Sequence, residues 1–167
     1  MSRRLTLLRH GEAAPAAAGG DFARILTRRG EREAWESATH IASHPPPPSR
    51  VLASEAPRAL QTASIARDAL GLPSSSLVPE LPLYLADART LLEAIAATDD
   101  ACTHLLVVGH NPGLSELVHA LAPGSAFGSL PTGGWCTLTS PAVSWSLLES
   151  DRARLERFEA PAAAPTR

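Results

Sequence analysis

The stretch Leu5-Thr-Leu-Leu-Arg9-His10-Gly11-Glu12 decides the fold of this chain and points to its chemistry. Its apolar residues predict a strand over residues 4–9 that runs directly into an Arg-His-Gly turn. Open α/β sheets bind ligands beside the carboxyl ends of their strands, where Arg9 and His10 would lie. Arginine offers phosphate oxygens a planar fork of donors, and histidine is a nucleophile or proton carrier near neutral pH.

Two later segments repeat this pattern of an apolar run that leads to a basic residue where a helix begins. One is Val51–Ser54, and the other is Leu105–Val108. Each basic residue taken alone has an ordinary interpretation as a loop residue. If the three strands are parallel neighbours, however, the basic side chains meet at one rim of the sheet: Arg9, His10, Arg58 and His110.

These segments resemble the histidine phosphatases, a superfamily that includes the phosphoglycerate mutases, and more narrowly the SixA-type phosphohistidine phosphatases. One difference is Glu55, where relatives usually carry proline, which leaves the loop before Arg58 undefined. The matching features follow in the expected order: Arg9-His10-Gly11, Leu26-Thr27-Arg-Arg-Gly30, Ser54 with Arg58-Ala-Leu-Gln61-Thr62-Ala63, Pro79-Glu80-Leu81, Val108-Gly109-His110-Asn111-Pro112 and Thr132-Gly133.

The resemblance implies a catalytic scheme in which the His10 position attacks phosphorus and becomes phosphohistidine. Arg9, Arg58 and His110 match the positions that bind the phosphoryl group. The covalent route splits one difficult transfer into two easier ones. Because two guanidiniums disfavour a cationic imidazole, we expect a lowered pKa for His10. We also expect its second ring nitrogen to donate to a backbone carbonyl, for which Gly11 is the candidate.

The proton donor for the leaving group is the least defined part of the scheme. Relatives that act on phosphate esters use a carboxylic acid, for which Glu80 is the first candidate and Glu12 and Asp87 are the next. An ordinary exposed glutamate explains Glu80 equally well. Imidazole, with a pKa near ~6.5, leaves phosphohistidine with little help. An alkoxide needs a positioned acid, which contributes about 10²–10⁴-fold.

The leading hypothesis is therefore a phosphohistidine phosphatase that acts on a signalling or phosphotransfer protein. The short segment between the Arg58 helix and Glu80 leaves little room for a lid, which disfavours a mutase and favours an open site. A small-molecule phosphomonoesterase of the same fold is the first alternative. A noncatalytic module that binds phosphorylated partners is the second. The substrate would be a phosphohistidine-bearing protein or a small phosphorylated molecule.

Composition excludes several other classes. The net charge of −2 argues against a nucleic-acid partner, and all 15 basic residues are arginine, which excludes a Schiff-base or P-loop lysine. No apolar stretch approaches the ~20 residues that cross a bilayer, and no signal peptide is recognisable, so a cytoplasmic protein without a membrane partner is expected. No cofactor or metal is expected, because His40 and His44 lack a third ligand.

Strand and helix patterns alternate along the chain and predict an α/β fold with three layers, α/β/α, around a mainly parallel sheet. We expect one domain over residues 1–158 and a flexible Ala/Pro-rich tail over residues 159–167. Residues 74–85 are expected to be irregular. Residues 133–139 and 143–148 are expected to pair as a terminal hairpin around Ser140-Pro141.

Overall fold

The structure is a computed structural model that describes residues 2–163. Its strands are β1 (Arg3–Arg9), β2 (Arg50–Ser54), β3 (Leu77–Glu80), β4 (His104–Gly109), β5 (Trp135–Ser140) and β6 (Arg154–Glu159). Its α-helices are α1 (Arg28–Ala42), α2 (Pro57–Ala69), α3 (Ala88–Ala96) and α4 (Gly113–Leu121). Short 3-10 turns occupy Ser74–Ser76, Leu81–Leu83 and Trp145–Leu147.

The six strands form one sheet in the order β3-β2-β4-β1-β5-β6. Strands β3, β2, β4 and β1 are parallel to one another, whereas β5 runs antiparallel to both β1 and β6. The two central strands, β4 and β1, are therefore bordered by parallel strands on one side and by an antiparallel pair on the other. The predicted mainly parallel sheet is confirmed.

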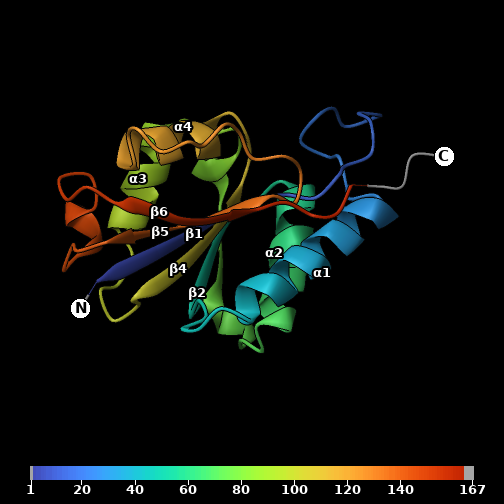
Figure 1. Cartoon of the computed structure of the whole chain (residues 1–167). Helices are drawn as coiled ribbons and strands as arrows, with labels where there is room; N and C mark the ends of the chain where they lie inside the picture. Colours follow the sequence, from blue (N-terminus) through green and yellow to red (C-terminus); the bar gives the residue numbers. More distant parts are fainter. Residues whose placement is uncertain (1, 164–167) are drawn as a thin grey trace.

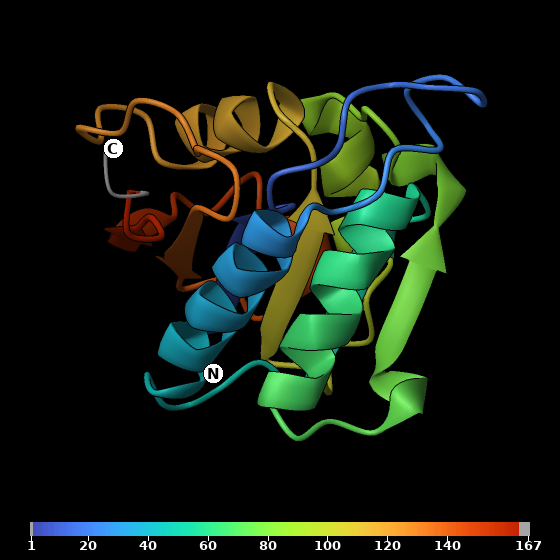
Figure 2. The same ribbon diagram turned by 90° about the vertical axis from the view of Figure 1, so that its right-hand side faces the viewer.

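Helices cover both faces of the sheet, as Figure 1 shows with α3 and α4 on one side and α1 and α2 on the other. Figure 2 shows α1 and α2 side by side in front of the sheet. Side chains of a strand alternate between the faces. In β1, Leu5 and Leu7 belong to the core under α3 and α4, while Leu8 belongs to the core under α1 and α2. The three-layer α/β/α architecture is confirmed.

Local sequence signals explain where the helices begin. The Thr27 side chain accepts a hydrogen bond from the amide of Gly30 and caps α1, and Asp87 does the same for α3 through Thr90. Pro57 opens α2 at a position where its missing N–H costs nothing. Each of these starts agrees with the sequence pattern.

Two predictions about the edges of the sheet were wrong. Residues 74–85 are not uniformly irregular, because Leu77–Glu80 forms β3 at one edge, where Pro79 is tolerated. The partner of β5 is β6, and residues 143–148 instead contain the 3-10 turn Trp145–Leu147, which buries Trp145 and Leu148. The strand β6 is charged and largely exposed, so its apolar pattern is weak.

Strand β6 ends at Glu159, the first residue of the expected tail, and the amide of Ala162 donates to Glu36. Residues 164–167 of the expected tail lie outside the described residues. Over residues 2–163, no helix is both long and apolar enough to span a membrane.

Candidate active site

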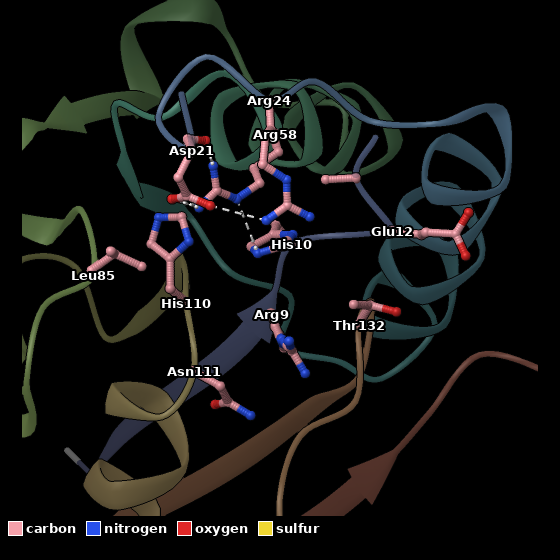
Figure 3. Close-up of a pocket in the computed structure, with 11 residues that line it drawn as sticks. Arg9, His10, Glu12, Asp21, Arg24, Arg58, Leu85, His110, Asn111 and Thr132 are labelled. Atoms are coloured by element: carbon pink, nitrogen blue, oxygen red, sulfur yellow. Dashed lines mark hydrogen bonds and ion pairs between the residues drawn. The ribbon is translucent and has the colours of Figure 1, made fainter. Parts of the chain in front are cut away.

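The register of the central strands brings the predicted site residues together. Arg9 pairs with Gly109 across β1 and β4, so His10 and His110 follow at the same level of the sheet. Their ring centroids lie 5.1 Å apart. Arg58, in the first turn of α2, reaches the same point, as Figure 3 shows. The predicted convergence of these four side chains is therefore present in the structure.

His10 has its two ring nitrogens in different environments. Its Nδ1 lies 2.7 Å from the carbonyl oxygen of Gly11, and its Nε2 lies 3.3 Å from Nε of Arg58. Both neighbours fix one tautomer, in which Nδ1–H donates to Gly11 and the Nε2 lone pair accepts from Arg58. The expected bond to Gly11 is thus found, and the unprotonated nitrogen faces the guanidinium.

Burial and nearby cations keep the His10 imidazole neutral. Only 7% of the residue is exposed. Burial lowers its pKa to about 4, and the charges of Arg58, Arg9 and Arg24 act in the same direction, while the hydrogen bond to Gly11 opposes them. The sequence predicted the direction from the guanidiniums, but desolvation is the larger cause.

His110 presents the opposite nitrogen to the site. Its Nε2 lies 2.7 Å from the hydroxyl of Ser54 at the end of β2. Its Nδ1 is buried and has no hydrogen-bond partner within residues 2–163. Burial lowers the pKa of His110 to about 3, with further contributions from His10 and Arg58. A buried ring nitrogen without a partner is unusual, and this one belongs to a pocket-lining residue beside His10.

Arg58 is 2% exposed and donates with all three of its side-chain nitrogens. Besides Nε to His10, its terminal nitrogens donate to the carbonyl oxygen of Asp21 at 2.8 Å and to the carboxylate of Asp21 at 3.0 Å. Glu55 stands where relatives usually carry proline. The loop around it is nevertheless ordered, because the amide of Ala56 donates to the hydroxyl of Ser54, and α2 begins at Pro57. Glu55 therefore does not prevent Arg58 from reaching the site.

The turn that carries His10 packs tightly against α1. A Cβ at Gly11 would lie 2.3 Å from the carbonyl oxygen of Gly30, and a Cβ at Gly30 would lie 2.0 Å from that of Glu12. The amide of Gly11 also donates to Thr62 at 3.2 Å. Only glycine fits at the two contact points, which explains why both motifs contain it.

The late Thr132-Gly133 motif supports the same turn from the other side. Gly133 has a φ of +68°, and its amide donates to the carbonyl oxygen of His10 at 3.0 Å. Its own carbonyl accepts from Ser37 of α1 at 2.6 Å. The loop before β5 thus links β1 to α1 and holds the backbone of His10 in place.

These residues line an open pocket of about 250 Å³. The carboxyl ends of β1 and β4 and the start of α2 supply its floor, and loops supply its rim (Figure 3). The lining residues are Arg9, His10, Glu12, Ala13, Asp21, Arg24, Arg58, Leu85, His110, Asn111 and Thr132.

Asp21 is the centre of an ion-pair cluster at the rim that the sequence pattern did not reveal. Its carboxylate accepts from Tyr84 Oη at 2.6 Å, from Arg24 at 3.0 Å and from Arg58 at 3.0 Å. The hydrogen bond from Tyr84, followed by that from Arg24, holds the pKa of Asp21 well below its usual range.

In the structure, each of the three candidate acids lies outside the pocket lining or is paired with another group. Glu80 ends β3 beside Ser54, but it does not line the pocket. Asp87 accepts from the Thr90 amide as the cap of α3. Glu12 lines the pocket, yet its carboxylate contacts Thr27 Oγ1 at 2.8 Å and Arg29 at 3.3 Å, and Figure 3 shows it directed away from His10.

The described residues contain no cluster of metal-binding side chains. Over residues 2–163, no group of three histidine, cysteine, aspartate or glutamate side chains is placed to hold a metal ion. His40 contacts Glu159, and His44 contacts the carbonyl oxygen of His40.

Comparison with known proteins identifies relatives of this chain. The sequence model of the histidine phosphatase superfamily (branch 1) matches residues 5–81. Phosphohistidine phosphatase SixA of Escherichia coli (strain K12) is 35% identical over 119 residues, which cover 71% of this chain and 73% of that protein.

Solved structures agree with these sequence matches. A structure named as a SixA phosphohistidine phosphatase from Nakamurella multipartitia has a TM-score of 0.86 at 26% identity and covers 98% of each chain. The protein histidine phosphatase SixA complexed with tungstate has a TM-score of 0.80 at 29% identity, covering 95% of this chain and 97% of that one. The shared architecture is the phosphoglycerate mutase-like fold.

Proposed function

This chain belongs to the histidine phosphatase superfamily, and from that premise we propose that it removes the phosphoryl group from phosphohistidine on a signalling or phosphotransfer protein. A phosphatase activity agrees with the family. The choice of a phosphohistidine substrate rests on one observation above all. Among the described residues that line the pocket there is a buried histidine, His10, and both carboxylates, Asp21 and Glu12, are paired with arginines.

In this proposal, three side chains at the floor of the pocket bind the phosphoryl group. Arg9 and Arg58 offer paired N–H donors to the equatorial oxygens, and the unpaired Nδ1 of His110 adds a third position. Because phosphoryl transfer depends mainly on positioning and charge stabilisation, a fixed cluster of donors supplies most of what the reaction needs. The tight packing of Gly11 against Gly30 keeps this cluster rigid.

His10 is the nucleophile in this scheme. Its Nε2 lone pair attacks phosphorus, an N–P bond forms, and the N–P bond of the substrate breaks. The Nδ1 proton stays on the ring, held by the carbonyl oxygen of Gly11. Water then attacks the phosphorylated His10, so that inorganic phosphate forms and the ring departs as a neutral imidazole. The same tautomer thus serves both attack and departure.

The leaving group of the first step explains the preference for phosphohistidine. The second nitrogen of its ring takes a proton from solvent near neutral pH, since imidazole has a pKa near ~6.5. The substrate histidine can then leave as a neutral ring without help from a protein acid. An alkoxide leaving group would need such an acid, and the two carboxylates that line the described pocket, Asp21 and Glu12, are both paired with arginines.

The scheme uses no metal ion. Arg9, Arg58 and His110 supply the charge stabilisation that a divalent cation supplies in other phosphatases. Prolonged treatment with EDTA should therefore leave the turnover of any accepted substrate unchanged. Loss of activity that returns with one divalent cation would contradict a metal-free reaction.

A comparison of leaving groups tests the proposal. Wild-type protein and His10→Gln are assayed on a phosphohistidine peptide, the matched phosphoserine peptide and a panel of sugar phosphates. We expect kcat/KM on the phosphohistidine peptide to exceed that on the alkyl esters by about 10²-fold or more, and His10→Gln to be inactive on all of them. A strong preference for one ester would instead identify a small-molecule phosphomonoesterase. Binding without turnover would identify a noncatalytic module.

A further inference from the structure

Leu85 combines two unusual features at the rim of the pocket. It is the one non-glycine residue with a positive φ, +48°, in the described part of the chain. Its side chain is also 55% exposed, although leucine is apolar. A bulky residue in the left-handed region is strained, and such strain is found mainly at functional sites. The conformation costs free energy and leaves an apolar side chain in water, so it calls for an explanation.

The residues around Leu85 are anchored on both sides, which maintains the strain. Leu83 is 1% exposed in the core, and Tyr84 is bound to Asp21 through its hydroxyl. On the other side, the carbonyl oxygen of Ala86 lies so near Gly113 that a Cβ there would approach it to 1.9 Å. These anchors restrain the backbone on both sides of Leu85 and so fix the direction in which its side chain leaves the chain.

The Leu85 side chain lies at the mouth of the phosphoryl pocket. Leu85 lines the pocket, and the other apolar lining residue is the small Ala13. Figure 3 shows Leu85 on the His110 side, across the pocket from Glu12 and Thr132. Tyr84, its neighbour, packs edge-on against His110 with ring centroids 5.6 Å apart. The His110 side of the pocket thus ends in an apolar surface at its outer edge.

The in-line geometry of phosphoryl transfer determines which part of the substrate contacts the apolar rim at Leu85. The leaving group lies on the far side of phosphorus from the attacking nitrogen. His10 Nε2 occupies the floor, so the leaving group points outward, toward the mouth where Leu85 is held. An imidazole ring has an apolar face that gains from contact with a leucine side chain. The hydroxyl-rich body of a sugar phosphate would gain nothing there.

We propose that Leu85 is a specificity-determining residue that packs against the imidazole ring of the phosphohistidine substrate. This inference rests on the proposed function and deepens it, since it identifies the group that recognises the ring and not the phosphoryl. The strained backbone is the means by which the apolar side chain is presented to the substrate instead of to the core.

Two substrates that both contain a P–N bond distinguish an effect on binding of the imidazole ring from an effect on the phosphoryl transfer itself. The phosphohistidine peptide carries the ring, and phosphoramidate does not. The variant Leu85→Asn keeps a residue that tolerates the left-handed region but loses the apolar contact. We expect its kcat/KM on the peptide to fall by roughly fivefold, mainly through KM. Its kcat/KM on phosphoramidate and its affinity for vanadate should equal those of the wild type.

Two further variants control for folding and for general surface effects. Leu85→Gly should unfold at the same temperature as the wild type or a higher one, because glycine adopts this φ without strain, and it should show the same selective loss on the peptide. Val143→Asn alters an exposed apolar residue outside the pocket and should leave kcat/KM unchanged on both substrates.

The outcomes distinguish this inference from the proposed function. If the wild type does not hydrolyse the phosphohistidine peptide at all, both fail. If it does, and Leu85→Asn hydrolyses the peptide as efficiently as the wild type, the inference alone is overturned. An equal loss on the peptide and on phosphoramidate would also overturn it, because that loss would come from a disturbed phosphoryl site.

Discussion

The two ends of β4 carry buried histidines whose pKa values are both lowered but whose hydrogen bonds differ. His104 begins the strand and His110 follows its last residue, and each is 3% exposed. Burial lowers the pKa of His104 to about 4 and that of His110 to about 3. At the amino end, Nδ1 of His104 donates to the carbonyl oxygen of Pro46 at 2.6 Å and Nε2 accepts from Thr6 at 2.8 Å. At the carboxyl end, His110 retains a nitrogen without a partner in the described residues.

This difference shows that a lowered pKa does not by itself mark a functional histidine. His104 is neutral because it is buried, and it satisfies both ring nitrogens within the fold. His110 is neutral for the same reason, but it lines a pocket with His10 and two arginines. In the proposed reaction, the functional end of the strand is the one whose histidine lines the pocket and keeps a ring nitrogen without a partner in the described residues. Changes at the carboxyl end should therefore affect activity, and changes at the amino end should affect stability.

Among the changes that leave His10 in place, the largest effect is expected for Arg58→Ala, at the carboxyl end of the parallel strands. Charge-assisted hydrogen bonds of a buried guanidinium to an anion contribute roughly 1.5–3 kcal/mol each. We therefore expect the affinity for vanadate, a mimic of the phosphoryl group, to fall by about tenfold or more. Arg67→Ala, in the last turn of the same helix and outside the pocket, is the matched control. Unchanged vanadate affinity in Arg58→Ala would remove it from the phosphoryl site.

The next effect is expected at the amino end, from His104→Ala. This variant leaves the carbonyl oxygen of Pro46 without its partner and removes one of the two hydrogen bonds of the Thr6 hydroxyl, which keeps that to Thr137. The free energy of unfolding should fall by about 1–3 kcal/mol, while kcat on any accepted substrate stays unchanged at a temperature where the variant is folded. Denaturant titration and an activity assay of the same sample measure both. A loss of kcat without loss of stability would contradict the division between the two ends.

The same histidine predicts how stability depends on pH. The pKa of His104 is about 4 in the folded protein, below the ~6.5 expected when it is unfolded. The unfolded state therefore binds more protons between these values, so this contribution is complete above pH ~6.5 and is lost as the pH falls through about 4. His10 and His110 act in the same direction. His104→Gln should flatten the decline, which denaturant titrations of the wild type and the variant between about pH 4 and pH 7 measure.

A smaller effect is expected at the rim, where Asp21 pairs with Arg58. The carboxylate fixes the guanidinium, and its replacement in Asp21→Asn removes the charge while it keeps the shape. We expect kcat/KM to fall by roughly threefold to tenfold, with a similar but smaller effect from Tyr84→Phe. If Asp21→Asn instead bound vanadate more tightly than the wild type, the carboxylate would be a competitor of the phosphoryl group and not a positioning residue.

The smallest effect is expected for Glu80→Gln. Since Glu80 does not line the pocket, the kcat/KM of Glu80→Gln on the phosphohistidine peptide should match that of the wild type. Glu93→Gln on exposed α3 serves as the control. A loss of about 10²-fold on an alkyl phosphate, with no loss on the peptide, would show that Glu80 reaches the leaving group after all.

The floor of the pocket could be predicted from the sequence because each of its residues stands at the end of a strand or the start of a helix. Apolar runs identify the strands, and parallel pairing brings their carboxyl ends together. Arg9, His10, Arg58 and His110 are therefore readable as a group. The tautomer of His10 was also predictable, since the turn offers a carbonyl at the next residue.

The rim could not be predicted in the same way. Asp21 and Leu85 lie on loops, where no periodic pattern fixes the position of a side chain. The role of Tyr84 depends on contacts between loops 63 residues apart in the chain. At the sheet edges, Pro79 made β3 hard to recognise as a strand in the sequence. The charged sequence of β6 gave no apolar pattern from which its pairing with β5 could be predicted. Edge strands commonly carry such residues, which weakens the pattern that identifies them.

The central claim is that His10, the buried neutral histidine with its Nε2 facing Arg58, becomes phosphorylated during turnover. The direct measurement is a rapid quench of the wild type with a phosphohistidine peptide into alkaline denaturant, which preserves phosphohistidine, followed by peptide mapping. We predict phosphate on His10 of the wild type, none on His10→Gln, and His110 unmodified in both. Phosphate on another residue, or undiminished turnover by His10→Gln, would contradict the account.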